Sequence, residues 1–424
     1  MKEELLHYVW RMQRFDCTNL FTTQGQKINI LRFGEYNRHA GPDFTDARIQ
    51  LDDTLWAGNV EMHLKASDWL SHGHQNDSAY QNVILHVVLE NDQPIQHASG
   101  EEIPCLELKS RIPSKVAKTY QRLLHNEHWV PCQQLLHQTP DITRQLWLDR
   151  LSIERLEKRC AWIKTILTDK KQDWEACLYQ SLARSFGMKV NSEPFEQLAR
   201  ITPLSLIRKH KHNIWQLEAL LLGQAGLLAG DFQEAYPLKL QREYKFLAHK
   251  YGLQAMPSTL WKFLRMRPAN FPSLRIAQFA LLLHQREHLF SKLLSVQNLK
   301  EVEVMFELEL SNYWQTHYVL NKPSVKKRKT LGKSTIHLFV INTLAPLLFL
   351  YGKEKDQASF CDKAIQLLEA IPAENNHIIT AWEKLGFSPV SSYQSQALLE
   401  LKNQYCNYKK CLSCGIGTAI LKSQ

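Results

Sequence analysis

The sequence has little glycine and proline and no long uninterrupted apolar run. Gly and Pro number 16 each among 424 residues, which excludes collagen-like and low-complexity chains. The most apolar stretch, from Ile336 to Tyr351, is interrupted by Asn342, Thr343 and Pro346, so we expect a buried helix rather than a membrane span. The N-terminus opens with charged residues and lacks the apolar core of a signal peptide. We therefore expect a soluble, cytoplasmic protein without a membrane partner.

Charge is divided unevenly along the chain. Lys and Arg total 52 against 42 Asp and Glu, a net charge of +10. Residues 1–138 carry 13 basic and 17 acidic residues, which leaves 39 basic and 25 acidic residues for the rest. An acidic first part joined to a basic second part suits an acid-lined metal site beside a surface that binds a polyanion. Evenly scattered surface charge is the plainer interpretation.

Hydrophobic periodicity predicts a mixed α+β fold in two domains. After a helix at residues 3–15, we expect strands at 27–33, 44–51, 54–65, 83–90 and 103–109. From about residue 117 the apolar spacing becomes helical, and no fixed-period repeat interrupts it. We expect a mixed α/β catalytic domain at residues 1–115 and a large, irregular all-α domain at residues 116–424.

The strand at residues 54–65 carries a set of ionisable side chains. Alternation places Glu61, His63 and Lys65 on one face and the apolar residues on the other. Asp43, at the head of the preceding strand, reaches the same place. Carboxylates of this kind hold Mg²⁺ or Mn²⁺, while a nearby His or Lys orients a water molecule. This hypothesis makes these four residues catalytic, and it requires an extended segment 58–65 with an accessible His63.

This order of elements resembles the PD-(D/E)XK nuclease core, which has a restriction-endonuclease-like fold. The matching residues are Pro42-Asp43 and Glu61-Met62-His63, with Glu3 or Glu4 as a helper acid on the first helix. The resemblance implies a metal-dependent nuclease or phosphodiesterase that acts on DNA or RNA. The chain departs from the pattern because His63 occupies the lysine position and the crossover, residues 66–82, is short for a full helix.

A histidine-rich segment offers a second interpretation of the same region. Imidazoles suit a softer metal such as Zn²⁺, Fe²⁺ or Mn²⁺. Two sets of two His and one carboxylate would serve a hydrolase or an oxygenase of a small substrate: His72, His74 and Asp77, or Glu61, His63 and His86. The plainer interpretation is a hydrogen-bonded turn around Gly73 and a core histidine at position 86. A third hypothesis is a non-catalytic nucleic-acid-binding or scaffold protein, in which His63 marks lost activity.

Nine cysteines in a cytoplasmic chain argue against a disulfide framework. Cys406, Cys411 and Cys414 lie within nine residues and suit a zinc site or an iron–sulfur cluster. The fourth ligand would then be Cys132, Cys361 or a histidine. Reduced free thiols are the alternative.

Basic residues of the second part are candidates for binding the substrate. Arg267 and Arg275 flank a turn at which Pro272 begins a helix. An exposed loop between Pro323 and Gly332 adds further cations that would contact phosphates: Lys326, Lys327, Arg328 and Lys329.

Several motifs together resemble a known family. They include residues 39–44, residues 56–63, Ser67-Asp68-Trp69 with His72-Gly73-His74, residues 85–88, residues 267–275, and Ile341-Asn342-Thr343 ahead of Tyr351-Gly352. With the terminal cysteines, they make the chain similar to the DUF2851 family of uncharacterised bacterial proteins of the Bacteroidetes type. The resemblance covers nearly the whole chain and implies no established activity.

Overall fold

The computed structural model describes residues 2–37 and 39–423, which divide into two compact units. Unit 1 comprises Met1–Leu148 together with Glu400–Gln424, and unit 2 comprises Asp149–Leu399. The chain passes from one unit to the other within α4 (Asp141–Asp169) and again at the end of α18 (Ser392–Glu400). The division therefore differs from the predicted boundary at residues 115 and 116. The change from strand to helix patterning near residue 117 marks a change of secondary structure inside unit 1.

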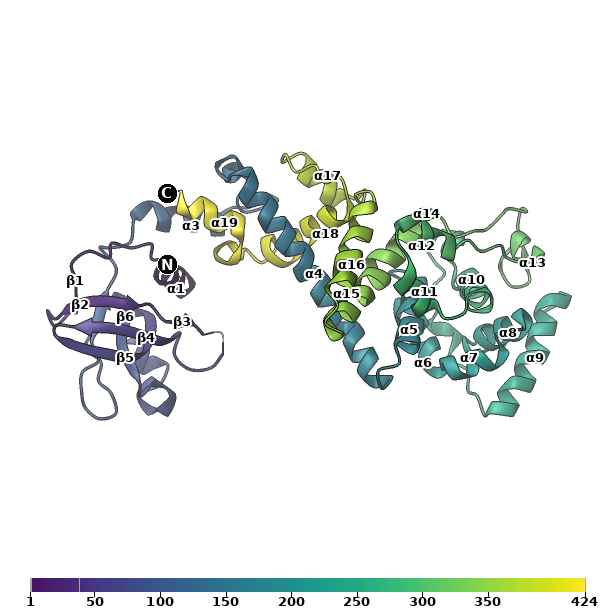
Figure 1. Ribbon diagram of the computed structural model, residues 1–424, viewed down its shortest axis with the longest axis horizontal. Helices are drawn as coiled ribbons and strands as arrows, with labels where there is room; N and C mark the ends of the chain where they lie inside the picture. Colours follow the sequence, from purple (N-terminus) through teal and green to yellow (C-terminus); the bar gives the residue numbers. More distant parts are fainter. Residues whose placement is uncertain (1, 38, 424) are drawn as a thin grey trace. The chain divides into compact units, whose positions relative to one another are not determined.

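Unit 1 is built on one mixed sheet, with strand order β1-β2-β4-β5-β6-β7 and β3 paired with β4 (Figure 1). Strands β2, β4 and β5 form an antiparallel meander, and β6 and β7 run parallel to β5. The strands are β1 (Leu20–Phe21), β2 (Lys27–Arg32), β3 (Glu35–Tyr36), β4 (Phe44–Leu51), β5 (Thr54–Lys65), β6 (Val83–Glu90) and β7 (Cys105–Glu107). The sequence therefore predicted the main strands and the mixed fold correctly.

Strand β5 is covered on both faces. On one face Val60 pairs with Phe44, whose ring contacts Trp10 of α1 (Glu3–Arg11). On the other face His63 contacts the ring of Trp69 in α2 (Asp68–Ser71). The short crossover from β5 to β6 continues through η1 (His74–Asn76) and η2 (Ser78–Tyr80). A cover that close leaves Glu61 and His63 on this face buried.

The C-terminal residues return to complete unit 1. Helix α19 (Gly415–Lys422) buries Ile416, Ile420 and Leu421 and contacts α3 (Ser114–His125), beside which it lies in Figure 1. It is tied to α1, since the Tyr8 hydroxyl donates to the Thr418 carbonyl oxygen at 3.5 Å. The other short elements of this unit are η3 (Gln133–Gln138), η7 (Leu401–Cys406) and η8 (Cys411–Ser413).

Unit 2 is almost entirely helical, with one small hairpin. One continuous apolar core includes leucines of the central helices α8 and α10. Its helices are α5 (Trp174–Phe186), α6 (Ser192–Ile201), α7 (Leu204–His210), α8 (Ile214–Gln224), α9 (Ala235–Tyr251), α10 (Pro272–Gln285), α11 (Leu289–Ser295), α12 (Leu299–Met305), α13 (Asn312–Thr316), α14 (Lys333–Phe339), α15 (Ala345–Glu354), α16 (Ala358–Ala370) and α17 (His377–Glu383). Short helical turns lie at η4 (Ser258–Leu260), η5 (Pro268–Asn270) and η6 (Val340–Leu344), and the hairpin consists of β8 (His317–Val319) and β9 (Lys322–Pro323).

One helical run is long and apolar enough, by composition, to cross a membrane. It extends over Lys333–Glu354, and 78% of its most apolar window is buried inside the protein. That is the environment of a core helix in a soluble protein, as the polar interruptions in the sequence predicted.

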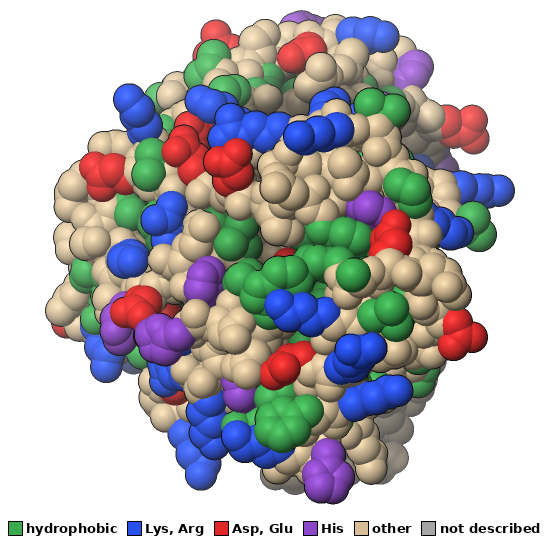
Figure 2. Space-filling view, turned by 90° about the vertical axis from the view of Figure 1, so that its right-hand side faces the viewer, with side chains coloured by type: hydrophobic (Ala, Val, Ile, Leu, Met, Phe, Trp, Pro, Cys, Tyr) green, Lys and Arg blue, Asp and Glu red, His purple; other side chains and the backbone are tan. Residues whose placement is uncertain are grey.

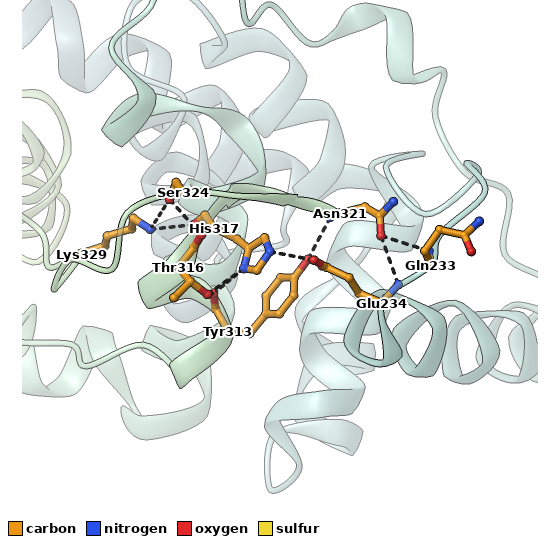
Figure 3. A network of polar contacts seen from close by, with 8 residues as sticks. All are labelled: Gln233, Glu234, Tyr313, Thr316, His317, Asn321, Ser324 and Lys329. Carbon is orange, nitrogen blue, oxygen red and sulfur yellow. Dashed lines mark hydrogen bonds and ion pairs between the residues drawn. The ribbon is translucent and has the colours of Figure 1, made fainter.

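A polar network holds the β8–β9 hairpin (Figure 3). Lys329 is buried, and its Nζ donates to the carbonyl oxygens of Trp314 and His317 at 2.8 and 3.1 Å. The His317 ring stacks on Tyr313, and its Nε2 lies 3.1 Å from Glu234 Oε1. These contacts are internal to the fold, so they explain the polar residues of this segment structurally.

Candidate metal centre

Glu61 and four histidines converge beside β5. Glu61 and His63 share one face of the strand, and His86 on β6 lies opposite Glu61 in the parallel register. His72 ends α2 and His74 begins η1, so the tight turn between them aims both rings at the strand. Gly73 permits this turn because its φ of 75° lies in the left-handed region.

The donor atoms of three of these histidines lie close enough together to be ligands of one ion, and Glu61 lies beside two of them. His63 Nε2 lies 3.1 Å from His72 Nδ1 and 3.7 Å from Glu61 Oε1, and His74 Nε2 lies 3.4 Å from the same Glu61 oxygen. Tetrahedral zinc with bonds of about 2.0–2.1 Å has ligand-to-ligand separations of about 3.4 Å. Within residues 2–37 and 39–423, the only group of three or more candidate ligands with donor atoms all within 4.8 Å is His63, His72 and His74.

The imidazoles are in the protonation state that a metal needs. Burial, reinforced by the neighbouring histidines, lowers the pKa of His63 to about 2 and that of His86 to about 3. Burial also lowers the pKa of His74. At neutral pH these rings are therefore uncharged, and each has a nitrogen lone pair to offer.

Two buried nitrogens of the cluster, His74 Nε2 and His86 Nδ1, are without a hydrogen bond. His74 Nε2 faces Glu61, whose Oε1 lies 3.4 Å away. Buried polar atoms are almost always satisfied, so an unpaired nitrogen beside a carboxylate suits a metal ligand. His63 is also supported from behind, because its Nδ1 lies 2.9 Å from His86 Nε2.

Asp43 and Glu61 lie close together, because each carboxylate accepts a hydrogen bond from backbone at or next to the other residue. The Asp43 backbone N–H donates to Glu61 Oε2 at 3.0 Å, and the Met62 N–H donates to Asp43 Oδ2 at 3.1 Å. Burial, with the negative charges of Asp43 and Glu3, raises the pKa of Glu61 to about 9. Without a metal the buried carboxyl is therefore protonated at neutral pH, whereas a bound cation would favour its ionised form.

His7 is a member of this region that sequence reasoning missed. Its Nε2 lies 3.1 Å from Asp43 Oδ2, the same oxygen that accepts from the Met62 N–H. The available signal was its position four residues after Glu3, which places both on one face of α1. The negative charge of Asp43 also acts on Glu3, whose pKa burial raises.

The predicted accessible face of β5 does not form. Glu61 and His63 are only 5% and 1% exposed, so the condition of an accessible His63 is not met. Lys65 is exposed at the end of β5, where its charge acts on Glu90 and Asp92. It therefore does not join the cluster. Among the donors, exposed His72 provides the contact with solvent.

Asp77, another predicted ligand, has a structural role. Its side chain accepts a hydrogen bond from the Ala79 N–H at 2.9 Å and caps η2. The helper acids differ in a similar way. Glu3 lies close enough to Asp43 and His72 for their charges to affect its pKa, whereas Glu4 accepts a hydrogen bond from the Tyr120 hydroxyl at 3.4 Å.

The predicted substrate-binding residues all lie in unit 2, and two of them are structural. Arg275 is buried, donates to Asn270 and Gln278 at 2.6 and 3.0 Å, and has its pKa lowered to about 10 by burial. The Lys329 ammonium donates hydrogen bonds to the backbone carbonyl oxygens of Trp314, Gln315 and His317. The remaining four are exposed: Arg267, Lys326, Lys327 and Arg328. On the face shown in Figure 2, Lys and Arg are dispersed among Asp and Glu rather than gathered in one stripe.

Four cysteines gather in unit 1. Cys406, Cys411 and Cys414 are buried, as is Cys132, and the segments that carry them pack together. Burial and the neighbouring thiols raise the pKa of Cys132 and Cys406. The predicted separation of about 4 Å for a single zinc ion is not met, since the histidine group alone has that spacing in the described part of the chain. Cys361 belongs to unit 2.

A family model with the description "Protein of unknown function (DUF2851)" matches residues 3–377. The chain belongs to the DUF2851 family. No curated protein and no solved structure matches this DUF2851 chain significantly. The part matched to DUF2851 contains Glu61 and all the histidines of the candidate metal centre, and it ends before the three C-terminal cysteines.

Proposed function

We propose that unit 1 is a metal-dependent phosphodiesterase, with nucleic acid as substrate and with its metal held by His63, His72, His74 and Glu61. The observation that carries the proposal is that the donor atoms of His63, His72 and His74 all lie within 4.8 Å of one another. Glu61 Oε1 lies beside two of them, 3.4 Å from His74 Nε2 and 3.7 Å from His63 Nε2. Three imidazoles and a carboxylate favour Zn²⁺, Mn²⁺ or Fe²⁺ over Mg²⁺, which prefers oxygen ligands.

The order of elements supports a nuclease-like reaction. Helix α1, the antiparallel strands β2, β4 and β5, the short crossover and the parallel strand β6 follow the order of the PD-(D/E)XK core. Asp43 and Glu61 occupy the acidic positions of that pattern. The histidines are this chain's departure from it, and they replace the missing lysine with a metal-ligating group.

The chemistry divides between the metal and the protein. A bound divalent ion would acidify a water molecule and polarise a phosphoryl oxygen. Glu61 would face the ion through Oε1, since its Oε2 is held by the Asp43 N–H. We assign Asp43 the role of general base. It borders the cluster, is partly accessible, and is held by the Met62 N–H and His7.

A small phosphoester or carboxylic ester is the second candidate substrate. Glu61 and His63 are buried, and His72 alone among the donors is exposed, so a narrow approach favours a small molecule.

The decisive experiment combines metal analysis with hydrolysis of a chromogenic phosphodiester and of single-stranded DNA. We expect about one Zn²⁺ or Mn²⁺ ion per protein chain in the wild type, together with metal-dependent cleavage. His72→Ala should weaken metal binding by at least about tenfold, because it removes a ligand from an exposed position without opening the core. Glu61→Gln should abolish cleavage.

His97→Ala is the matched control, since His97 lies in the same unit and outside the cluster. It should bind metal and cleave like the wild type. The proposal is wrong if His72→Ala and His97→Ala have equal metal affinity. Metal binding without cleavage of any diester would leave a metal-binding, non-catalytic protein.

A further inference from the structure

Two adjoining cavities in unit 1 lie between α1 and the C-terminal residues. The larger has a volume of about 580 Å³ and the smaller about 140 Å³. They share four lining residues, which makes them one groove: Glu4, Tyr120, Lys409 and Lys410. The total is in the range of pockets that hold ligands of several rings.

One face of α1 forms a wall of this groove. Glu4, His7, Tyr8 and Arg11 follow the spacing i, i+3, i+4 and i+7, which places them side by side on a helix. Lys409 and Lys410 form the facing wall, from the segment that follows η7. The groove therefore exists only because the end of the chain returns to α1.

The groove is cationic and carries aromatic rings. Lys2, Arg11, Lys409 and Lys410 line it, against Glu4 as the acidic residue. The Arg11 guanidinium lies 5.3 Å from the ring centre of Tyr36, and Lys410 Nζ lies 5.3 Å from that of Tyr408. Arg11 Nε is buried without a hydrogen bond, so this cation has a donor to offer.

The groove ends at the acidic side of the metal centre. His7 lines the smaller cavity, and its Nε2 lies 3.1 Å from Asp43 Oδ2. His7 is therefore the residue that joins this groove to Asp43, since it lines the smaller cavity and contacts the carboxylate. All of these residues belong to unit 1.

We propose that this groove binds a single strand of nucleic acid and leads it to the metal centre. Backbone phosphates would contact Arg11 and Lys410, and unpaired bases would stack on Tyr36 and Tyr408. Cations interleaved with aromatic rings are the features by which proteins hold single strands, because each base presents a face for stacking. A duplex hides those faces, so the groove favours the single strand. The delivery of the strand to a reaction rests on the proposed function, whereas its binding does not.

Binding of a fluorescent oligothymidylate to the full-length protein, measured by anisotropy in EDTA over a range of salt, tests this groove. The variant Arg11→Gln/Lys410→Gln removes two cations and leaves Lys409, whose Nζ donates to the Leu124 carbonyl oxygen. We expect the slope of log affinity against log salt to fall by about 1.4, since each phosphate contact contributes about 0.7 for a single strand. Affinity should fall at least about tenfold at low salt.

Two control variants make the result specific. Lys115→Gln/Lys118→Gln removes two exposed cations of α3 in the same unit, and Lys292→Gln/Lys300→Gln removes two exposed cations from unit 2. Both should bind as the wild type does, and an unlabelled duplex should compete poorly. Lys410 is exposed, so Lys410→Gln alone, with half the change in slope, covers the case in which the double variant is unstable.

The outcomes separate this groove from the metal centre. Unchanged binding by both Arg11→Gln/Lys410→Gln and Lys410→Gln overturns the groove, whatever the enzyme cleaves. An equal loss in the unit 2 control also overturns it, because binding would then follow net charge. Groove-dependent binding without metal-dependent cleavage would support the groove and reject the proposed function.

Discussion

A buried carboxyl group in unit 2 should make stability depend on pH. Glu218 is buried, accepts hydrogen bonds from the Tyr236 hydroxyl and the Trp314 indole N–H, and has its pKa raised from 4.5 to about 7 by burial. Since the folded pKa exceeds the unfolded one, its contribution is full below about pH 4.5 and is lost as pH rises through 7. The loss is roughly 3 kcal/mol.

Urea unfolding of the wild type and of Glu218→Gln, compared at about pH 5 and about pH 8, measures this contribution. Gln can accept from Trp314 and donate to Tyr236, so the variant keeps both contacts without a titrating group. We expect the wild type to lose roughly 3 kcal/mol more than the variant between the two conditions. Equal pH dependence would mean that Glu218 is ionised at no extra cost.

At the metal centre, the residues were predictable and their environment was not. Alternation along β5 correctly placed Glu61 and His63 on one face, because strand geometry depends on local sequence alone. Their burial depends on Trp69 in the crossover, which folds back over that face. His7 was missed for the same reason, since its contact with Asp43 joins a helix to a distant strand.

Among the elements, the parallel pairing of β5 with β6 depends on Gly58, which lies where the two strands approach each other closely. A Cβ on Gly58 would lie 2.5 Å from Ile84 Cγ2 and 2.6 Å from the Asn82 carbonyl oxygen. The backbone atom cannot yield as a flexible side chain does. Gly58→Ala should therefore push β6 away from β5, at the end of the pairing that aligns His86 with Glu61.

We expect Gly58→Ala to lower the free energy of unfolding by about 1–3 kcal/mol and to weaken metal binding. Gly332→Ala is the control, because nothing lies within 4 Å of its added Cβ and its φ is −70°. It should change stability by less than about 0.5 kcal/mol. Thermal unfolding measures the stability of both variants, and metal titration measures their metal affinity. If Gly58→Ala and Gly332→Ala had equal effects, the contact between β5 and β6 at position 58 would tolerate a methyl group.

Elements with strong periodicity were the most predictable. The strands at 44–51, 54–65 and 83–90 have the predicted bounds, and Pro272 begins α10 as expected. The apolar spacing over residues 204–229 predicts a single helix, but the structure has two helices there, α7 and α8. They are separated near Asn213, which caps the second helix by accepting a hydrogen bond from the Trp215 N–H. An Asn at this position is a recognisable helix N-cap in the sequence. The apolar spacing continues on both sides of it, however, so the pattern did not predict the break between α7 and α8.

At the scale of the molecule, unit 1 needs both ends of the chain. Ile420 of α19 is 0% exposed, whereas Lys422 on the same helix is exposed. We expect Ile420→Ala to destabilise unit 1 by about 2–5 kcal/mol and Lys422→Ala to change it by less than about 0.5 kcal/mol. Hydrogen exchange should show faster exchange in α1 and α3 of Ile420→Ala, with α8 and α10 of unit 2 unaffected. Faster exchange confined to α19 would contradict this dependence.

The domain boundary was the least predictable feature of the molecule. Sequence patterning reports secondary structure, and it changes near residue 117, where α3 begins. The packing of α19 on α3 joins residues that are far apart in the chain, so no local sequence pattern predicts this contact. Long-range contacts of this kind also bring Cys132 near the cysteines of the C-terminal segment. Cys132 was one of several candidates that the sequence left open as a fourth ligand.

The insertion of unit 2 between the two parts of unit 1 fixes an order for synthesis on the ribosome. Residues 149–399 are contiguous, so unit 2 can fold while translation continues. Unit 1 begins first and finishes last, because the segment from residue 400 onward must emerge before α19 can cover α1 and α3. During that interval the nascent chain carries an uncovered apolar face on α1 and α3, which makes it a client for chaperones. A truncated product that ends before residue 400 would lack Lys409 and Lys410, which form one wall of the proposed groove, so we expect it to bind single strands less tightly than the full chain.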